Sequence, residues 1–140
     1  MSDPGDWSQT LMTAARAARK NAYAPYSSFS VGAAVRTADG LVFSGTNVEN
    51  ASYGLTMCAE RVAIFTAIAA GATNLKAIAI TSGGSRLVSP CGACRQVMAE
   101  HLPLDASVLL DGEGGQTKMV TVGELLPLAF VPSDLPGESS

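Results

Sequence analysis

Charged side chains are scarce in this chain. Only 15% of its 140 residues are Asp, Glu, Lys or Arg, and the formal net charge is -3 at pH 7. A protein that neutralises nucleic-acid phosphates needs clustered Lys and Arg residues, and no basic stripe occurs in this sequence. The composition therefore disfavours polynucleotide binding and fits a small or uncharged substrate better.

The sequence also lacks an uninterrupted apolar run of about 18 residues, the length that a membrane-spanning helix requires. Residues 1–6 are acidic and carry neither the basic nor the apolar region of a signal peptide. We therefore expect a cytoplasmic protein. Because 47% of the residues in so short a chain are hydrophobic, we also expect other subunits to cover part of the apolar surface.

Alternating helix and strand patterns predict an α/β domain. The predicted helices cover residues 11–22, 58–70 and 91–101, with capping candidates Asp6 and Ser8 before the first and a short last helix after the capping-box sequence at Thr121. The predicted strands cover residues 29–36, 41–48, 75–81 and 106–110, and a further strand precedes Thr121. This order predicts one sheet with helices on its faces, partly parallel beyond the first hairpin.

The length favours a single domain over residues 1–140, with a core from about 7 to 131 and a loose tail from 132 to 140. The predicted helix 58–70 is apolar almost all round. Because a helix without a clearly polar face is typical of a protein interior, we expect this helix to be buried.

The three cysteines are the chemically distinctive residues. Cys91 and Cys94 lie one turn apart at the predicted start of a helix, so their thiols share a face, and Cys58 stands at the start of another predicted helix. Helix N-termini favour the thiolate because their free amides and dipole stabilise negative charge. Three thiolates suit a tetrahedral zinc ion with one open position, which is the catalytic arrangement.

Other interpretations of these cysteines stay open at this point. A C-x-x-C pair is also typical of a redox dithiol, and a lone cysteine such as Cys58 is often core filler. A structural zinc site would need a fourth ligand, but the single histidine, His101, lies about two turns beyond Cys94 on the same predicted helix. The odd number of cysteines therefore favours a catalytic site over a structural one.

Glu60 and Arg61 follow Cys58 closely in an otherwise apolar helix. A carboxylate in such a place is costly unless it has a partner or a task, and beside activated water it can carry protons. The alternative is a solvated residue that favours the helix dipole. An arginine that donates to the thiolates would restore the electrophilicity of the zinc ion, whereas the alternative for Arg61 is an ordinary surface arginine.

Two cysteine segments, 56–61 and 89–96, resemble the zinc-binding signature of the small homotetrameric cytidine deaminases. The resemblance extends to residues 23–29, 31–34, 47–53 and 124–127 with Phe130, and so covers about residues 11–130. It implies a three-layer α-β-α fold with a mixed sheet of about five strands. It also implies one Zn²⁺ per subunit on Cys58, Cys91 and Cys94, with Glu60 as the proton shuttle and Arg61 beside the sulfur atoms.

The activity that the resemblance implies is hydrolytic deamination of cytidine and 2'-deoxycytidine in pyrimidine salvage, in a homotetramer that binds neither nucleic acid nor membrane. The remaining implied contacts are Phe29 against the base, Asn47 and Glu49 on the ribose hydroxyls, the Ser89 carbonyl on the exocyclic amine, Ala51 and Tyr53 in an adjacent subunit's site, and Phe130 over the base of a third. A related deaminase that acts on blasticidin S is the alternative. Polynucleotide editing is disfavoured because the chain has no basic channel.

Overall fold

The computed structural model describes residues 4–82, 87, 89–112 and 117–136. The helices are α1 (Pro4–Arg19), α2 (Ala59–Ala69), α3 (Gly92–His101) and α4 (Val122–Leu125), with short 3-10 turns at Tyr53–Leu55 and Pro132–Asp134. The strands are β1 (Val31–Thr37), β2 (Val42–Thr46), β3 (Leu75–Ser82), β4 (Ser107–Asp111) and β5 (Thr117–Thr121).

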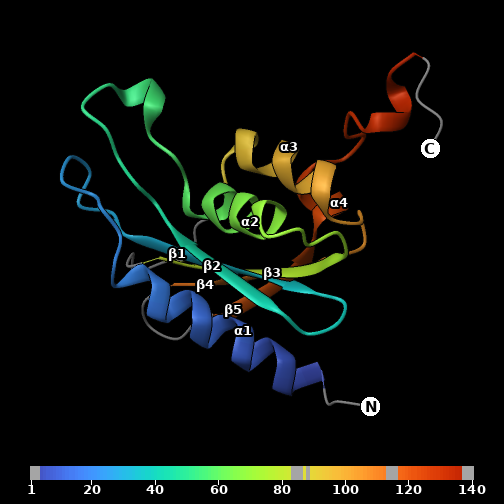
Figure 1. Ribbon diagram of the computed structural model, residues 1–140, viewed down its shortest axis with the longest axis horizontal. Helices are drawn as coiled ribbons and strands as arrows, with labels where there is room; N and C mark the ends of the chain where they lie inside the picture. The colour runs from blue at the N-terminus through green and yellow to red at the C-terminus, as the bar shows by residue number, and fades with distance from the viewer. Residues whose placement is uncertain (1–3, 83–86, 88, 113–116, 137–140) are drawn as a thin grey trace.

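The strands form one five-stranded sheet in the order β2-β1-β3-β4-β5. The β3–β4 pair is parallel, whereas the other three neighbouring pairs are antiparallel. Figure 1 shows α1 on one side of the sheet and α2, α3 and α4 on the other. The predicted three-layer α-β-α architecture with a mixed sheet is therefore confirmed.

Alternation along β1 and β3 divides the core between the two faces of the sheet. Val35, Ile78 and Ile80 face α2 and α3 in the larger cluster, whereas Ala34, Ala77 and Ala79 face α1 in the smaller one. The bulky residues therefore fill the layer that carries the cysteines, and the alanines allow α1 to approach the sheet closely.

Two glycines make close contact between the layers possible. A Cβ atom at Gly32 would lie 2.1 Å from the carbonyl oxygen of Ala15 in α1. A Cβ atom at Gly45 would lie 2.5 Å from the amide nitrogen of Ala63 in α2. Both distances are far below van der Waals contact, so α2, with Cys58 at its start, is seated directly on the backbone of β2.

The predicted helices and strands are all present, with shifted ends. The first helix begins at Pro4, so the predicted caps Asp6 and Ser8 lie inside it and that part of the prediction is wrong. The earlier start lets Trp7 pack against the α1 core cluster. The capping box at Thr121 and Glu124 is confirmed. The glycine-rich residues 83–86, between β3 and α3, and 113–116, between β4 and β5, lie outside the described part of the chain.

The predicted burial of α2 is confirmed for its inner face and wrong for its outer face. Its inner face is buried through Ala63, Ile64 and Ala67, but Phe65 and Ile68 are 42% and 40% exposed. The reason is geometric, because a helix that forms the outer layer of a single chain turns one side to solvent. Within the described residues, no helix combines the length and apolar character needed to cross a bilayer.

Candidate metal centre and adjoining pocket

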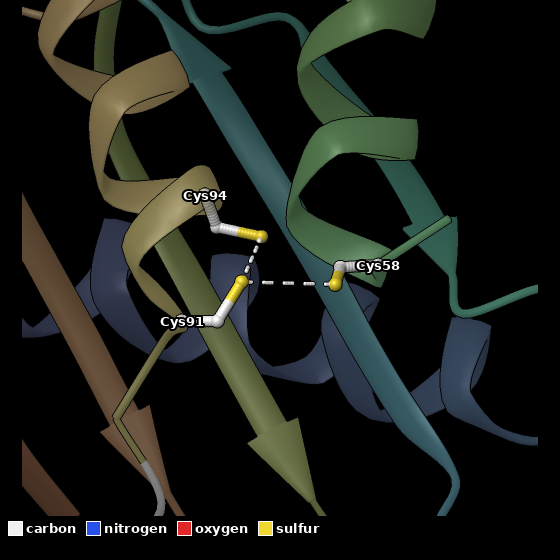
Figure 2. Close-up of side chains that lie close together, drawn as sticks. All are labelled: Cys58, Cys91 and Cys94. Carbon is white, nitrogen blue, oxygen red and sulfur yellow. Dashed lines mark hydrogen bonds between the residues drawn. The ribbon is translucent and has the colours of Figure 1, made fainter. Parts of the chain in front are cut away.

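The three cysteines converge where α2 and α3 begin side by side (Figure 2). Cys58 and Cys91 are the N-cap residues of α2 and α3, and neither thiol caps its own helix. Cys94 lies in the first turn of α3. The Sγ atoms of Cys91 and Cys94 are 3.5 Å apart, and those of Cys58 and Cys91 are 4.0 Å apart.

This cysteine cluster (Cys58, Cys91 and Cys94) fits a zinc ion. All three sulfur atoms lie within 4.8 Å of one another. Tetrahedral bonds of about 2.3 Å from zinc to sulfur would place the sulfurs about 3.8 Å apart, close to the two measured separations. The free N-termini of two helices add favourable electrostatics for thiolates. The donor set leaves one of four tetrahedral positions without a cysteine ligand.

The surroundings of the cluster favour negative charge on the Cys58 sulfur. Hydrogen bonding from the Cys94 thiol, together with Arg61, lowers the pKa of Cys58 to about 5. The Nη2 atom of Arg61 donates to the Sγ atom of Cys58 over 3.3 Å. Hydrogen bonding to Cys58 and burial raise the pKa of Cys94. Arg61 therefore lies beside the cluster and donates to one of its sulfur atoms, as the sequence analysis predicts.

A pocket of about 230 Å³ opens beside the cluster. Its lining includes seven of the residues predicted for the site, namely Phe29, Asn47, Glu49, Cys58, Glu60, Ser89 and Cys91. Typical ligand pockets enclose roughly 300–1,000 Å³, so this one suits a small metabolite. The carboxyl-terminal end of β3 forms its floor through Ile80 and Ser82.

Glu60 lines the pocket together with Cys58 and Cys91. It is in the first turn of α2 and only 5% exposed. Burial is the main factor that raises the pKa of Glu60, and the negative charge of the Cys58 sulfur adds to this effect. A carboxyl group with a raised pKa can both accept and release a proton near neutral pH.

Asn47 and Glu49 also line the pocket, and hydrogen bonds with the backbone hold both side chains in place. The Oδ1 atom of Asn47 accepts from the Val31 amide at 2.9 Å, and its Nδ2 atom donates to the Phe29 carbonyl at 2.8 Å. The Oε1 atom of Glu49 accepts from the amides of Tyr26 and Ser27. These bonds fix both side chains without using all of their hydrogen-bonding capacity.

The Ser27 hydroxyl also donates to the Oε2 atom of Glu49. This bond is the largest of the effects that lower the pKa of Glu49, followed by the two backbone amides. The role of Ser27 was missed by the sequence reasoning, because its contact spans 22 positions along the chain. No local pattern signals such a contact.

Three of the residues predicted to contact the substrate lie outside this pocket in the single chain. Ala51 is exposed, and Tyr53 and Phe130 are 76% and 55% exposed. The Tyr53 ring packs edge-on against Tyr26, with 6.2 Å between the ring centroids. The carbonyl of Phe130 accepts from the Nε2 atom of Gln96 at 2.8 Å. The rings of Tyr53 and Phe130 are therefore exposed on the single chain. In the sequence, Tyr53 precedes the three cysteines and Phe130 follows them.

Comparison with known protein sequences identifies the family of this chain. Residues 5–108 match the family described as the cytidine and deoxycytidylate deaminase zinc-binding region. A cytidine deaminase of Halalkalibacterium halodurans is 52% identical over 127 residues, which cover 91% of this chain and 96% of that protein. A blasticidin-S deaminase of Bacillus cereus is more distant, with 34% identity over 71% of this chain and 76% of that protein.

Solved structures agree with this relationship. A crystal structure of cytidine deaminase from Burkholderia pseudomallei superposes with a TM-score of 0.84 and 52% identity, over 87% of this chain and 98% of that one. A family match that spans more than half of the chain, together with the close relatives, establishes the relationship. The chain belongs to the family of zinc-binding cytidine and deoxycytidylate deaminases.

Proposed function

We propose that this protein hydrolyses cytidine and 2'-deoxycytidine to uridine and 2'-deoxyuridine, with release of ammonia. One observation carries the proposal. Three thiols within 4.8 Å of one another meet at a pocket that also contains a buried carboxyl group. Zinc-dependent deamination needs this combination of a three-ligand metal site and a separate proton carrier. The relatives named above support the choice of nucleoside.

Cys58, Cys91 and Cys94 would hold the zinc ion, which would activate water for attack at C4 of the pyrimidine ring. Glu60 accepts the proton that the attacking water loses and delivers it to N3 of the ring. It then carries the proton of the new C4 hydroxyl to the departing amino group, so that ammonia leaves and the C4 carbonyl forms. The buried position of Glu60 supports this exchange, because burial raises its pKa toward the working pH. Arg61 stabilises the thiolate of Cys58 by donating a hydrogen bond to its sulfur atom.

Phe29 packs against the base, and the carbonyl of Ser89 accepts a hydrogen bond from the exocyclic amine. Asn47 and Glu49 bind the ribose hydroxyls. The hydrogen bonds that hold these two side chains support this role, because they orient both groups before a ligand arrives. A sugar that lacks the matching hydroxyl would leave a polar group of the site without a partner.

Neighbouring subunits complete the pocket in a homotetramer. Ala51 and Tyr53 reach an adjacent subunit's site, and Phe130 covers the base in a third. The exposure of Tyr53 and Phe130 supports this arrangement, because burial of a large aromatic ring against a neighbouring subunit is energetically favourable. The exposed Phe65 and Ile68 of α2 supply further apolar surface for such contacts.

The test of the activity is an absorbance assay for cytidine loss, with ammonia release and zinc content measured on the same preparation. We expect zinc-loaded protein to convert cytidine and 2'-deoxycytidine, and chelator-treated protein to regain activity with zinc but not with magnesium. Absence of turnover by zinc-loaded protein contradicts the proposal. Faster turnover of blasticidin S than of cytidine would assign the site to that nucleoside instead.

Shared sites are tested by mixing inactive subunits. A Glu60→Ala chain and a Phe130→Ala chain, each poorly active alone, are expected to regain activity when co-expressed, because some sites then receive an intact residue from each chain. Turnover no greater than the sum of the separate preparations would contradict a shared site. Size-exclusion chromatography of the active species gives its subunit number. The cytoplasmic location and the place in pyrimidine salvage stay predictions.

A further inference from the structure

Arg95 connects the metal-binding turn to a distant part of the chain. It directly follows Cys94 in α3, and its side chain is partly buried. Its Nε atom donates to the Pro90 carbonyl, and its Nη2 atom donates to the Ser89 hydroxyl, each over 2.8 Å. Its Nη1 atom donates to the carbonyl of Leu125, also over 2.8 Å. One guanidinium group thus joins three separate acceptors.

The first two bonds act on the residues immediately before Cys91. The Pro90 carbonyl belongs to the peptide group whose nitrogen is that of Cys91, so fixing this oxygen fixes the plane from which the Cys91 side chain projects. Ser89 and Pro90 also line the pocket. The backbone amide of Arg95 in turn donates to the Cys91 carbonyl at 3.0 Å. The turn is therefore held from both sides of the ligand residue.

The third bond ends on a firm support. Leu125 is the last residue of α4, and a carbonyl at a helix C-terminus has no partner within its own helix. The helix is itself anchored, because its Gly123 amide donates to the Leu104 carbonyl at 2.8 Å and its Thr121 cap is complete. A planar group with several fixed donors is needed to span these positions, which favours arginine over lysine.

We propose that Arg95 is a positioning residue for the zinc site, which sets the Ser89-Pro90-Cys91 turn against α4 so that the Cys91 thiol meets the other two. Arg95 is not among the residues that line the pocket, and its side chain donates to Pro90, Ser89 and Leu125 rather than to a cysteine sulfur, so it acts on the zinc site through Cys91. Its loss leaves the Pro90 carbonyl without this donor and allows the turn to move. The inference rests on the proposed function only in taking Cys91 as a zinc ligand.

The test compares zinc affinity in wild type, Arg95→Ala and Arg95→Lys, by competition with a chromogenic chelator. Loss of a group that orients a metal ligand typically weakens binding about 10- to 100-fold, and we expect Arg95→Ala to fall in this range. Arg95→Lys keeps the charge but not the planar fork, so we expect an intermediate loss. It also carries the test should Arg95→Ala fail to fold.

Melting temperatures separate positioning from general destabilisation. A purely structural residue would lower the melting temperature of zinc-free and zinc-loaded protein by the same amount. A positioning residue reduces the additional stability that zinc confers, since that stability depends on the dissociation constant. The matched control is Gln96→Ala, the next residue of α3, which loses a bond to the Phe130 carbonyl and none to the turn. We expect its zinc affinity to match that of wild type.

Zinc affinity of both Arg95 variants within about twofold of wild type would overturn the inference, as would an undiminished rise in melting temperature on zinc addition. The outcome is separable from that of the proposed function. Wild-type protein that binds zinc and deaminates cytidine upholds the activity whatever the Arg95 variants do. Wild-type protein without zinc would remove the basis of both.

Discussion

Replacement of Glu60 by glutamine separates the chemistry of the site from its architecture. Glu60→Gln keeps the size of a side chain that is only 5% exposed, but it removes the group that can take up and release a proton. Positioned acid–base groups contribute about 10²- to 10⁴-fold to a rate. At 1.36 kcal/mol per factor of ten, this corresponds to about 2.7–5.4 kcal/mol of barrier.

We therefore expect turnover of cytidine to fall about 100- to 10,000-fold, with zinc content unchanged because the cysteines are intact. The melting temperature of the zinc-free variant is expected to equal or exceed that of wild type, because an amide is easier to bury than a carboxylate. Loss of activity together with retained or increased stability is the pattern expected of a functional residue.

The assay is the absorbance change of cytidine at saturating concentration, with metal analysis and thermal unfolding on the same samples. Glu100→Gln is the matched control, because it removes the same charge from an exposed position of α3. Its turnover is expected to equal that of wild type. Turnover of Glu60→Gln within about tenfold of wild type would refute the assignment of Glu60 as the proton carrier.

Three further predictions concern the surroundings of the site. Ser27→Ala removes the largest of the effects that lower the pKa of Glu49, so the pKa of Glu49 should rise. As the pH is lowered from neutral, the KM for cytidine should therefore begin to increase at a higher pH in the variant than in wild type. KM profiles that coincide would contradict this prediction. Gly45→Ala places a Cβ atom 2.5 Å from the amide nitrogen of Ala63, and should lower the free energy of unfolding in urea by about 1–3 kcal/mol or more, whereas Gly54→Ala, which meets nothing within 4 Å, should not. Removal of zinc by a chelator should lower the melting temperature reversibly, and an unchanged melting curve would count against zinc as part of the folded core.

The metal site was the part most accessible from the sequence. The C-x-x-C spacing of Cys91 and Cys94 is a local property, since one helical turn brings both thiols to one face. The 4.0 Å separation of Cys58 and Cys91 is not local, because it depends on two helices starting side by side. The odd number of cysteines favoured a metal site shared by all three, and the structure confirms that the three thiols converge.

Other features depended on packing that no local pattern reports. Phe65 and Ile68 on α2 are exposed, although the apolar sequence of this helix predicted burial. The hydrophobicity of a side chain indicates that it favours burial, but it does not indicate which neighbour covers it. The early start of α1 followed from the packing of Trp7 against the sheet, which overrode the capping preferences of Asp6 and Ser8.

The sequence by itself determined the order of helices and strands and the supply of three thiols and a nearby carboxylate, because these follow from short-range periodicity and residue chemistry. Only the tertiary structure decided which groups hold one another. The Ser27–Glu49 and Arg95–Leu125 hydrogen bonds join residues 22 and 30 positions apart. Such contacts arise when the layers pack, since the positions of the layers, and not the intervening sequence, set the distance between the partners.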